Sequence, residues 1–291
     1  MKKRIISVCL SAVFLFCSAD IYACTGFLVG KKASVDGSVM ISYAADSHTL
    51  YGEMYHWPAA VWPKGALLEV VEWDTGKPLG KIPQVEQTYS VVGNMNEYQL
   101  AITESTWGGR PELVDTAGII DYGSLIYITL QRAKTAREAI KVMTDLVTEH
   151  GYCSGGESFS VADKNEAWIL EMIGKGLGNK GAVWVAIRIP DDCISAHANQ
   201  SRIHQIPFDD KENCVYSPDV VSLAREKGYF NGKDKDFSFT NAYCPYDFGG
   251  LRACEARVWA FFRKYDPSMD KYEALIKGDS TQKPMPLYIK P

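Results

Sequence analysis

The sequence predicts an α+β fold, in which antiparallel strand pairs and helices occupy separate stretches of one chain. Strand-pair signals occur near the start and in the middle of the chain, and helical spacing is concentrated at 123–150 and 251–265. Strands and helices do not alternate as they do in parallel sheets. The 291 residues, 46% of them hydrophobic and 23% charged, have a composition typical of a globular chain with a large core.

The first 23 residues resemble a cleavable export signal. Three basic residues at 2–4 precede an apolar run at 5–16, and Ala23 supplies the small residue that a signal peptidase needs before the cut. The run is shorter than the ~20 residues of a membrane-spanning helix. We therefore expect a signal peptide over 1–23, a mature domain over 24–291, and export to the periplasm or the cell exterior.

Cleavage after Ala23 would place Cys24 at the mature N-terminus, with its thiol and its free α-amine in one residue. That pairing can act as nucleophile and base. Cleavage after Ala19 is the competing site. The segment Ile21-Tyr22-Ala23-Cys24 also loosely fits a lipobox, in which the cysteine is acylated and serves as an anchor. Position alone leaves the nucleophile and lipoprotein interpretations open.

Charge and side-chain spacing give no reason to expect nucleic acid, metal or a cofactor. Removal of the signal takes the formal charge from −4 to 28 − 34 = −6, and the basic residues are scattered rather than gathered in a stripe. The cysteines show no C-x-x-C spacing and the histidines no H-E-x-x-H spacing. Six cysteines remain after cleavage, and their pairing stays open.

The first half of the mature chain predicts strands followed by a helical block. Segments 24–30 and 38–43 form a hairpin with Asp36-Gly37 in its turn, which puts residue 24 at a strand end. Prolines punctuate 57–83, as in edge strands and loops. Segment 91–103 is expected to form strand, turn and strand, and 123–150 a helical pair.

The second half predicts two more strand pairs and a late helix. Asp163-Lys164-Asn165 separates the strands 158–162 and 167–172, and the strands 183–189 and 194–197 flank a further turn. Helical spacing returns at 251–265. The whole order is that of layered sheets and helices.

Five sequence blocks carry a resemblance to a known family. They are Cys24-Thr25 with 29–34 and Asp36-Gly37-Ser38, then Gly93-Asn94-Met95-Asn96-Glu97, Gly156-Glu157-Ser158-Phe159, Asn165-Glu166-Ala167-Trp168 and His197-Ala198-Asn199-Gln200. Together they resemble the PepD-type (dipeptidase A) family of cysteine N-terminal nucleophile hydrolases, related to penicillin V acylase and conjugated bile acid hydrolase. The resemblance implies a four-layer αββα sandwich. Members of the family continue beyond the segment matching 286–291, so we expect a C-terminally incomplete sandwich.

The resemblance also implies catalytic residues. Cys24 would be the nucleophile, with its own α-amine (pKa roughly 7.7–8) as base. Asp46 would orient the amine and thiol or hold the substrate's amino group. Asn199 would help to build the oxyanion hole, and Arg257 matches a late arginine of the related acylases, with Arg252 as the second choice. Without the resemblance, Asn199 is an ordinary turn residue and Arg257 an ordinary surface arginine.

Three further residues are predicted to bind substrate. Tyr43 stands three residues before Asp46, where the wider superfamily usually has an arginine. Asn96 and Thr106 belong to segments expected near the substrate, although Asn-Glu at a hairpin tip is also common turn chemistry.

The function predicted first is an exported dipeptidase that hydrolyses short peptides through a thioester on Cys24. The alternatives are an acylase or amidase acting on a non-peptide amide, a non-catalytic peptide-binding lipoprotein, and a papain-like pair of Cys153 with His197. The expected partner is a small peptide. Membrane attachment is expected only if Cys24 is lipidated, and oligomer formation stays open.

Overall fold

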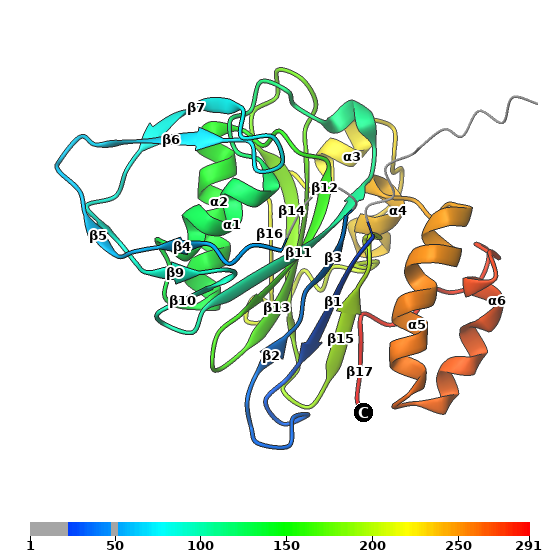
Figure 1. Ribbon diagram of the computed structural model, residues 1–291. Coiled ribbons are helices and arrows are strands. Elements are labelled where there is room, and N and C mark those ends of the chain that lie inside the picture. Colours follow the sequence, from blue (N-terminus) through cyan, green and yellow to red (C-terminus); the bar gives the residue numbers. More distant parts are fainter. Residues whose placement is uncertain (1–22, 48–51) are drawn as a thin grey trace, which may run out of the picture.

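The computed structural model describes residues 23–47 and 52–291, so the predicted signal segment lies outside the described residues. An eight-stranded antiparallel sheet forms the centre of the fold, in the order β16-β14-β13-β12-β11-β10-β9-β4 (Figure 1). Its strands are β4 (His56–Trp57), β9 (Val91–Val92), β10 (Met95–Asn96), β11 (Ala101–Gly108), β12 (Gly156–Ala162), β13 (Ala167–Gly174), β14 (Ala182–Ile189) and β16 (Cys214–Tyr216).

A smaller antiparallel sheet carries the predicted mature start. Its strands are β1 (Ala23–Val29), β2 (Met40–Ile41), β3 (Ala44–Asp46), β15 (Ile194–His197) and β17 (Tyr288–Ile289). The order is β17-β15-β1-β2, and β3 also pairs with β1. Two separate two-stranded sheets join β5 (Ala60–Val61) to β8 (Gln87–Thr88) and β6 (Leu67–Val71) to β7 (Pro78–Pro83).

The helices fall into two groups in the chain. Between β11 and β12 come η1 (Pro111–Leu113), α1 (Tyr122–Leu130) and α2 (Ala136–His150). After β16 come α3 (Ser222–Glu226), η2 (Asp234–Asp236), α4 (Phe239–Tyr243), a π-helical turn (Gly250–Glu255), α5 (Ala256–Arg263), η4 (Pro267–Tyr272) and α6 (Glu273–Ile276). Within the described part of the chain, every helix falls short of the length and apolar character needed to cross a bilayer.

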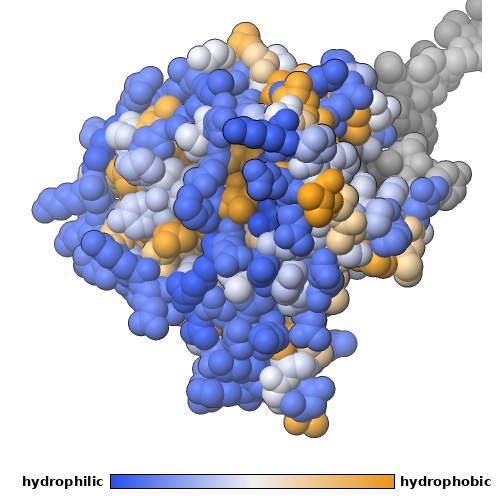
Figure 2. Space-filling model, turned by 90° about the vertical axis from the view of Figure 1, so that its left-hand side faces the viewer, coloured by the Kyte–Doolittle hydropathy of each residue, from blue (hydrophilic) through white to orange (hydrophobic). Residues whose placement is uncertain are grey.

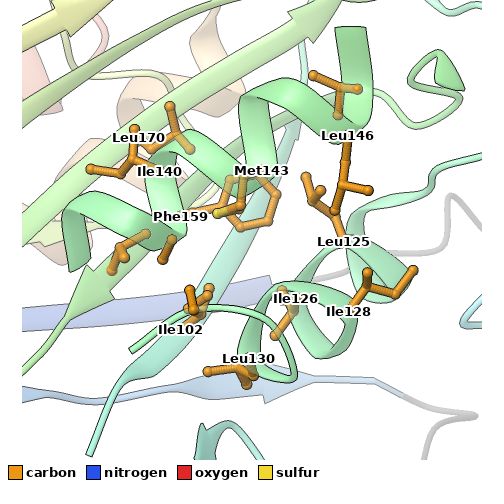
Figure 3. Close-up of a cluster of buried hydrophobic side chains, with 14 of the residues drawn as sticks. Ile102, Leu125, Ile126, Ile128, Leu130, Ile140, Met143, Leu146, Phe159 and Leu170 are labelled. Carbon is orange, nitrogen blue, oxygen red and sulfur yellow. The ribbon is translucent and has the colours of Figure 1, made fainter. Parts of the chain in front are cut away.

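Three apolar clusters hold these elements together. The first joins α1 and α2 to one face of the large sheet, where Met143 of α2 packs among side chains such as Phe159 and Leu170 (Figure 3). The second brings Leu28 of β1 together with residues of β13 and β14. The third packs Val258 and Phe262 against the small sheet. In Figure 1, α5 lies beside the small sheet on the right, while α1 and α2 cover the large sheet.

These observations confirm the predicted α+β class and the strand pair at 158–162 and 167–172. The expected pairing of 183–189 with 194–197 is wrong, because β14 belongs to the large sheet and β15 to the small one. The first hairpin forms, but its second strand is split into β2 and β3, both paired with β1. Ser42 lies at the split, where its Oγ accepts a hydrogen bond from Phe27 N–H at 3.2 Å. The helical block is a helix pair as expected, and Thr135 starts its second member by accepting a hydrogen bond from Glu138 N–H. The expected late helix begins with a π turn.

A buried arginine joins the late helix to the small sheet. Arg202 forms an ion pair with Glu255 at 2.9 Å, and each side chain is 1% exposed. Three more of its N–H groups donate to the carbonyl oxygens of Ala196, Pro286 and Leu287 at 2.9–3.2 Å. One side chain therefore fixes β15, the start of α5 and the segment leading into β17 relative to one another.

Candidate active site

Cys24 lies at the end of β1, and hydrogen bonds hold both its backbone polar atoms. Alternate residues of this strand are buried, and Cys24 is among them with 6% of its surface exposed. Its N–H donates to Asn199 Oδ1 at 2.7 Å. Its carbonyl oxygen accepts a hydrogen bond from Arg257 Nη1 at 2.6 Å. In the described chain the Cys24 nitrogen is a peptide nitrogen, and it marks the place of the α-amine that cleavage after Ala23 would create.

Asn199 occupies the turn after β15 with its backbone in the left-handed region, at φ 57°. Asparagine tolerates this conformation better than most residues with a Cβ. The pairing of β1 with β15 sets Gly26 opposite His197 and so brings Asn199 to Cys24. The Asn199 amide nitrogen donates to the carbonyl oxygen of Thr106 at 2.6 Å. Asn199 therefore links the end of β1 to β11 across the two sheets.

Arg257, in the first turn of α5, acts on this site through its hydrogen bonds to protein atoms. Besides the Cys24 carbonyl it donates to Thr25 Oγ1, Asn199 Oδ1 and the carbonyl oxygens of Ala198 and Ala253, at 2.7–3.0 Å. These bonds use all five N–H donors of a guanidinium group. Arg257 is therefore a positioning residue for Cys24 and Asn199. Arg252 is exposed and lies over the Phe248 ring, 5.7 Å from its centre, so it does not join the site.

Tyr43 and Asp46 approach Cys24 from the strand beside it. The Tyr43 hydroxyl donates to Glu104 Oε1, and the same oxygen lies 4.0 Å from Cys24 Sγ. Asp46 is exposed at the end of β3, where its residue pairs with Ala23. Burial raises the pKa of Cys24, and hydrogen bonds to the sulfur from the Asn199 side chain and the Asp46 backbone lower it to a smaller extent. The predicted role of the Asp46 carboxylate stays a prediction.

Two buried carboxyl groups complete the surroundings of the thiol, and neither is among the site residues predicted from the sequence. Glu104 and Thr106 project from the same face of β11, and Glu157 of β12 pairs with Thr106. Thr106 donates to Glu157 Oε1 at 2.6 Å. Glu104 is 2% exposed and Glu157 is fully buried. Charged residues inside buried strands are rare, so a glutamate within an otherwise apolar strand segment is the feature of the sequence that could have indicated a functional role.

The electrostatics of this cluster favour a neutral thiol. Burial raises the pKa of Cys24 to about 12, and the negative charges of Glu104 and Glu157 contribute to the same rise. Burial also raises the pKa of both carboxyl groups, and the charge of Glu104 raises that of Glu157 further. A base beside the sulfur is therefore needed before Cys24 can act as a nucleophile at neutral pH.

Asn96 is not brought to this cluster. Its side-chain nitrogen donates to the carbonyl oxygens of Leu130 and Ala133 at 2.8 and 2.7 Å. Its side-chain oxygen accepts from the N–H groups of Tyr98 and Leu100 at 3.0 and 3.1 Å. The buried amide thus ties the β10 turn to the end of α1. The turn interpretation of this residue explains these contacts, and a role in binding substrate is not supported by them.

The papain-like alternative is wrong, because His197 is occupied on both ring nitrogens. Nδ1 lies 2.6 Å from Ser105 Oγ and Nε2 lies 2.7 Å from Ser160 Oγ. Burial lowers the pKa of His197 to about 3, so the ring is neutral at physiological pH. Cys153 lies in a loop, where its N–H bonds to the Ile120 carbonyl. His197 therefore braces the sheets behind the site and cannot be the base for Cys153.

Two hollows in the described surface are lined by residues other than Cys24. A groove of about 580 Å³ runs between β2 and the start of β11, and an aromatic hollow of about 390 Å³ lies under β6 and β7. Figure 2 shows the face on the β4–β7 side, where hydrophobic residues form small patches among hydrophilic ones.

The six cysteines in the described ranges are all unpaired, Cys24 included.

Comparison with known proteins identifies the family of this chain. The model of peptidase family C69 matches residues 23–56 and 52–291. The chain is 28% identical to a "Probable dipeptidase" of Salmonella dublin over 89% of its own length and 62% of the relative's. It is 27% identical to a "Probable dipeptidase" of Latilactobacillus sakei (86% and 54%) and 26% identical to "Dipeptidase A" of Lactobacillus helveticus (84% and 54%). The chain thus spans between about half and two thirds of the length of these relatives, and it belongs to peptidase family C69.

Proposed function

We propose that this chain is a dipeptidase in which Cys24, made N-terminal by cleavage after Ala23, attacks the peptide bond. Membership of a peptidase family and the relatives named as dipeptidases support peptide hydrolysis. The observation that carries the mechanism is the 2.7 Å bond between Cys24 nitrogen and Asn199 Oδ1. An α-amine at this position would donate one N–H to Asn199 and keep its lone pair for the proton of its own thiol.

The reaction proceeds in two halves. The Cys24 thiol proton passes to the α-amine as the sulfur bonds to the scissile carbonyl carbon, and the amine then delivers that proton to the departing nitrogen. This leaves a thioester on Cys24. Water, deprotonated by the same amine, attacks the thioester carbon, and the proton returns to the sulfur. Asn199 is suited to stabilise the oxyanion, and Arg257 holds the strand end in place.

The fold and the location belong to the same proposal. Two apposed antiparallel sheets with α1 and α2 on one side and α5 on the other fit a four-layer αββα sandwich of the N-terminal nucleophile type. Export would provide the peptidase that creates the free cysteine.

Intact-mass and N-terminal analysis of the secreted protein, together with Cys24→Ala and Cys24→Ser variants, tests this proposal. The expected result is an unblocked cysteine at position 24 and loss of dipeptide hydrolysis in Cys24→Ala, with slow hydrolysis in Cys24→Ser. A mature chain that begins elsewhere, a lipid on Cys24, or full activity of Cys24→Ala would refute it.

A further inference from the structure

The buried pair Glu104 and Glu157 receives hydrogen bonds from the described protein but no positive charge. Oε1 of Glu104 accepts from Tyr43, and Oε1 of Glu157 accepts from Thr106. Both Oε2 atoms are buried and have no donor from another residue in the described structure, while a hydrogen bond between the two carboxyl groups lowers the pKa of Glu104 and raises that of Glu157, after the larger effect of burial on each. Within the described ranges, no lysine, arginine or histidine forms an ion pair with either residue. A buried carboxylate without a positive partner is costly, so these atoms indicate a site for a cationic group from outside the chain.

We infer that Glu104 and Glu157 form the subsite for the α-ammonium group of the peptide substrate. This inference rests on the proposed function, because it takes Cys24 as the atom that attacks the first peptide bond. It adds the residues that recognise the free amino terminus and so decide which amides reach the thiol.

The distances fit an ammonium group one bond away from the reacting carbonyl. In an amino acid the α-nitrogen lies about 2.5 Å from its own carbonyl carbon. An attacking sulfur approaches that carbon at about 3–3.5 Å. Glu104 Oε1 lies 4.0 Å from Cys24 Sγ. With the carbonyl carbon beside the sulfur, the adjacent ammonium group is within hydrogen-bond reach of Glu104.

The electrostatics around this pair suit a cationic group. Burial raises the pKa of both carboxyl groups, and the charge of Glu104 raises that of Glu157 further, so a positive charge placed beside the pair would be stabilising. Asp74, whose Oδ1 accepts a hydrogen bond from the Tyr122 hydroxyl at 2.7 Å, adds negative charge nearby and raises the pKa of both glutamates after the larger effect of burial. This surrounding charge favours cations and opposes carboxylates.

Binding of the ammonium group would also prepare the nucleophile. After the larger effect of burial, the charges of Glu104 and Glu157 disfavour the thiolate of Cys24. A positive charge placed between them removes this repulsion at the moment when substrate is present. The substrate therefore contributes to the activation of the thiol that cleaves it, and N-acylated peptides lack this contribution.

A comparison of free and N-acetylated substrates tests the subsite. The measured quantity is the kcat/KM for Ala-Ala divided by that for N-acetyl-Ala-Ala, in wild type, Glu157→Gln and the matched exposed variant Glu86→Gln. We expect the ratio to fall at least about 100-fold in Glu157→Gln and to stay unchanged in Glu86→Gln. A ratio in folded Glu157→Gln equal to that of wild type overturns the inference.

A second measurement needs no substitution in the subsite. L-alaninol carries the ammonium group without a scissile bond, and N-acetyl-alaninol lacks the charge. We expect L-alaninol to inhibit wild-type hydrolysis at least about 100-fold more strongly, and equal inhibition by the two compounds overturns the inference. Loss of all hydrolysis in Cys24→Ala, combined with equal inhibition in wild type, would overturn the subsite while leaving the proposed nucleophile intact.

Discussion

Replacing Arg257 by lysine would keep the positive charge but remove the planar array of N–H donors that the guanidinium group provides. Four of its five hydrogen bonds reach Cys24, Thr25, Ala198 and Asn199, at 2.6–3.0 Å. A lysine ammonium is a compact group on a flexible stem, and we expect it to keep one or two of these contacts. Hydrogen bonds to a charged group contribute about 1.5–3 kcal/mol each when buried.

Partial exposure of Arg257 and the contacts retained by lysine reduce the expected loss. We therefore expect the free energy of unfolding to fall by about 2–4 kcal/mol. The effect on catalysis should be larger, because a shift of about 1 Å at a reacting group costs about 100-fold in rate. The expected kcat for a dipeptide is thus about 100-fold lower, with a smaller change in KM.

Urea unfolding followed by circular dichroism measures the first quantity, and steady-state hydrolysis of Ala-Ala measures the second. Arg252→Lys is the matched control, since Arg252 precedes Arg257 by five positions and is exposed. We expect the control to change stability by less than about 0.5 kcal/mol. A folded Arg257→Lys enzyme with kcat within threefold of wild type would refute the positioning role.

Three further predictions concern the residues behind the site. In Gly26→Ala the new Cβ would lie 2.7 Å from the His197 ring, and we expect a loss of about 1–3 kcal/mol in urea unfolding; an unchanged midpoint would contradict this packing. Because the pKa of His197 is lowered to about 3, the unfolded state binds its proton first, and stability should fall as the pH drops from about 6.5 toward 3. The buried acids affect wild type and His197→Gln alike, so their contribution cancels in the difference between the two pH profiles. Wild type should lose about 1.4 kcal/mol more unfolding free energy per pH unit in that window, and parallel profiles would exclude His197 as the cause. Asn96→Ala should cost about 2–4 kcal/mol of stability through its four lost hydrogen bonds while kcat of the folded fraction stays within threefold of wild type; a large fall in kcat would instead place Asn96 at the substrate.

Local patterns predicted the parts of the site that are close in sequence to a recognisable element. The Asp36-Gly37 turn signal predicted a hairpin with Cys24 at the start of its first strand. The structure agrees, because β1 begins at Ala23. The pairing of β1 with β15 then brings the block containing Asn199 to the cysteine. The resemblance pointed to Arg257, which the structure places in contact with both residues.

Residues whose role depends on packing between strands were harder to predict. Glu104 directly follows the expected strand segment 91–103, and its face and its distance from Glu157 depend on the register of β11 against β12. That register is a long-range property of the sheet. For Asn96 the local turn signal was correct, but its hydrogen bonds to the end of α1 come from tertiary packing that the local sequence does not indicate.

The Arg202 side chain couples a strand distant in sequence to the arrangement around Cys24 and Asn199. It bonds to the carbonyl oxygens of Pro286 and Leu287, 84 and 85 positions along the chain, while its ion pair reaches Glu255, two residues before Arg257. Detachment of β17 would remove acceptors from a buried cation and loosen the turn that presents Asn199. Amide hydrogen exchange at Ile289 should therefore follow the same opening event as exchange at Asn199, whose N–H donates to Ser105 Oγ at 3.4 Å, and a spectroscopic label on this strand would sense the arrangement around Cys24 without contacting it.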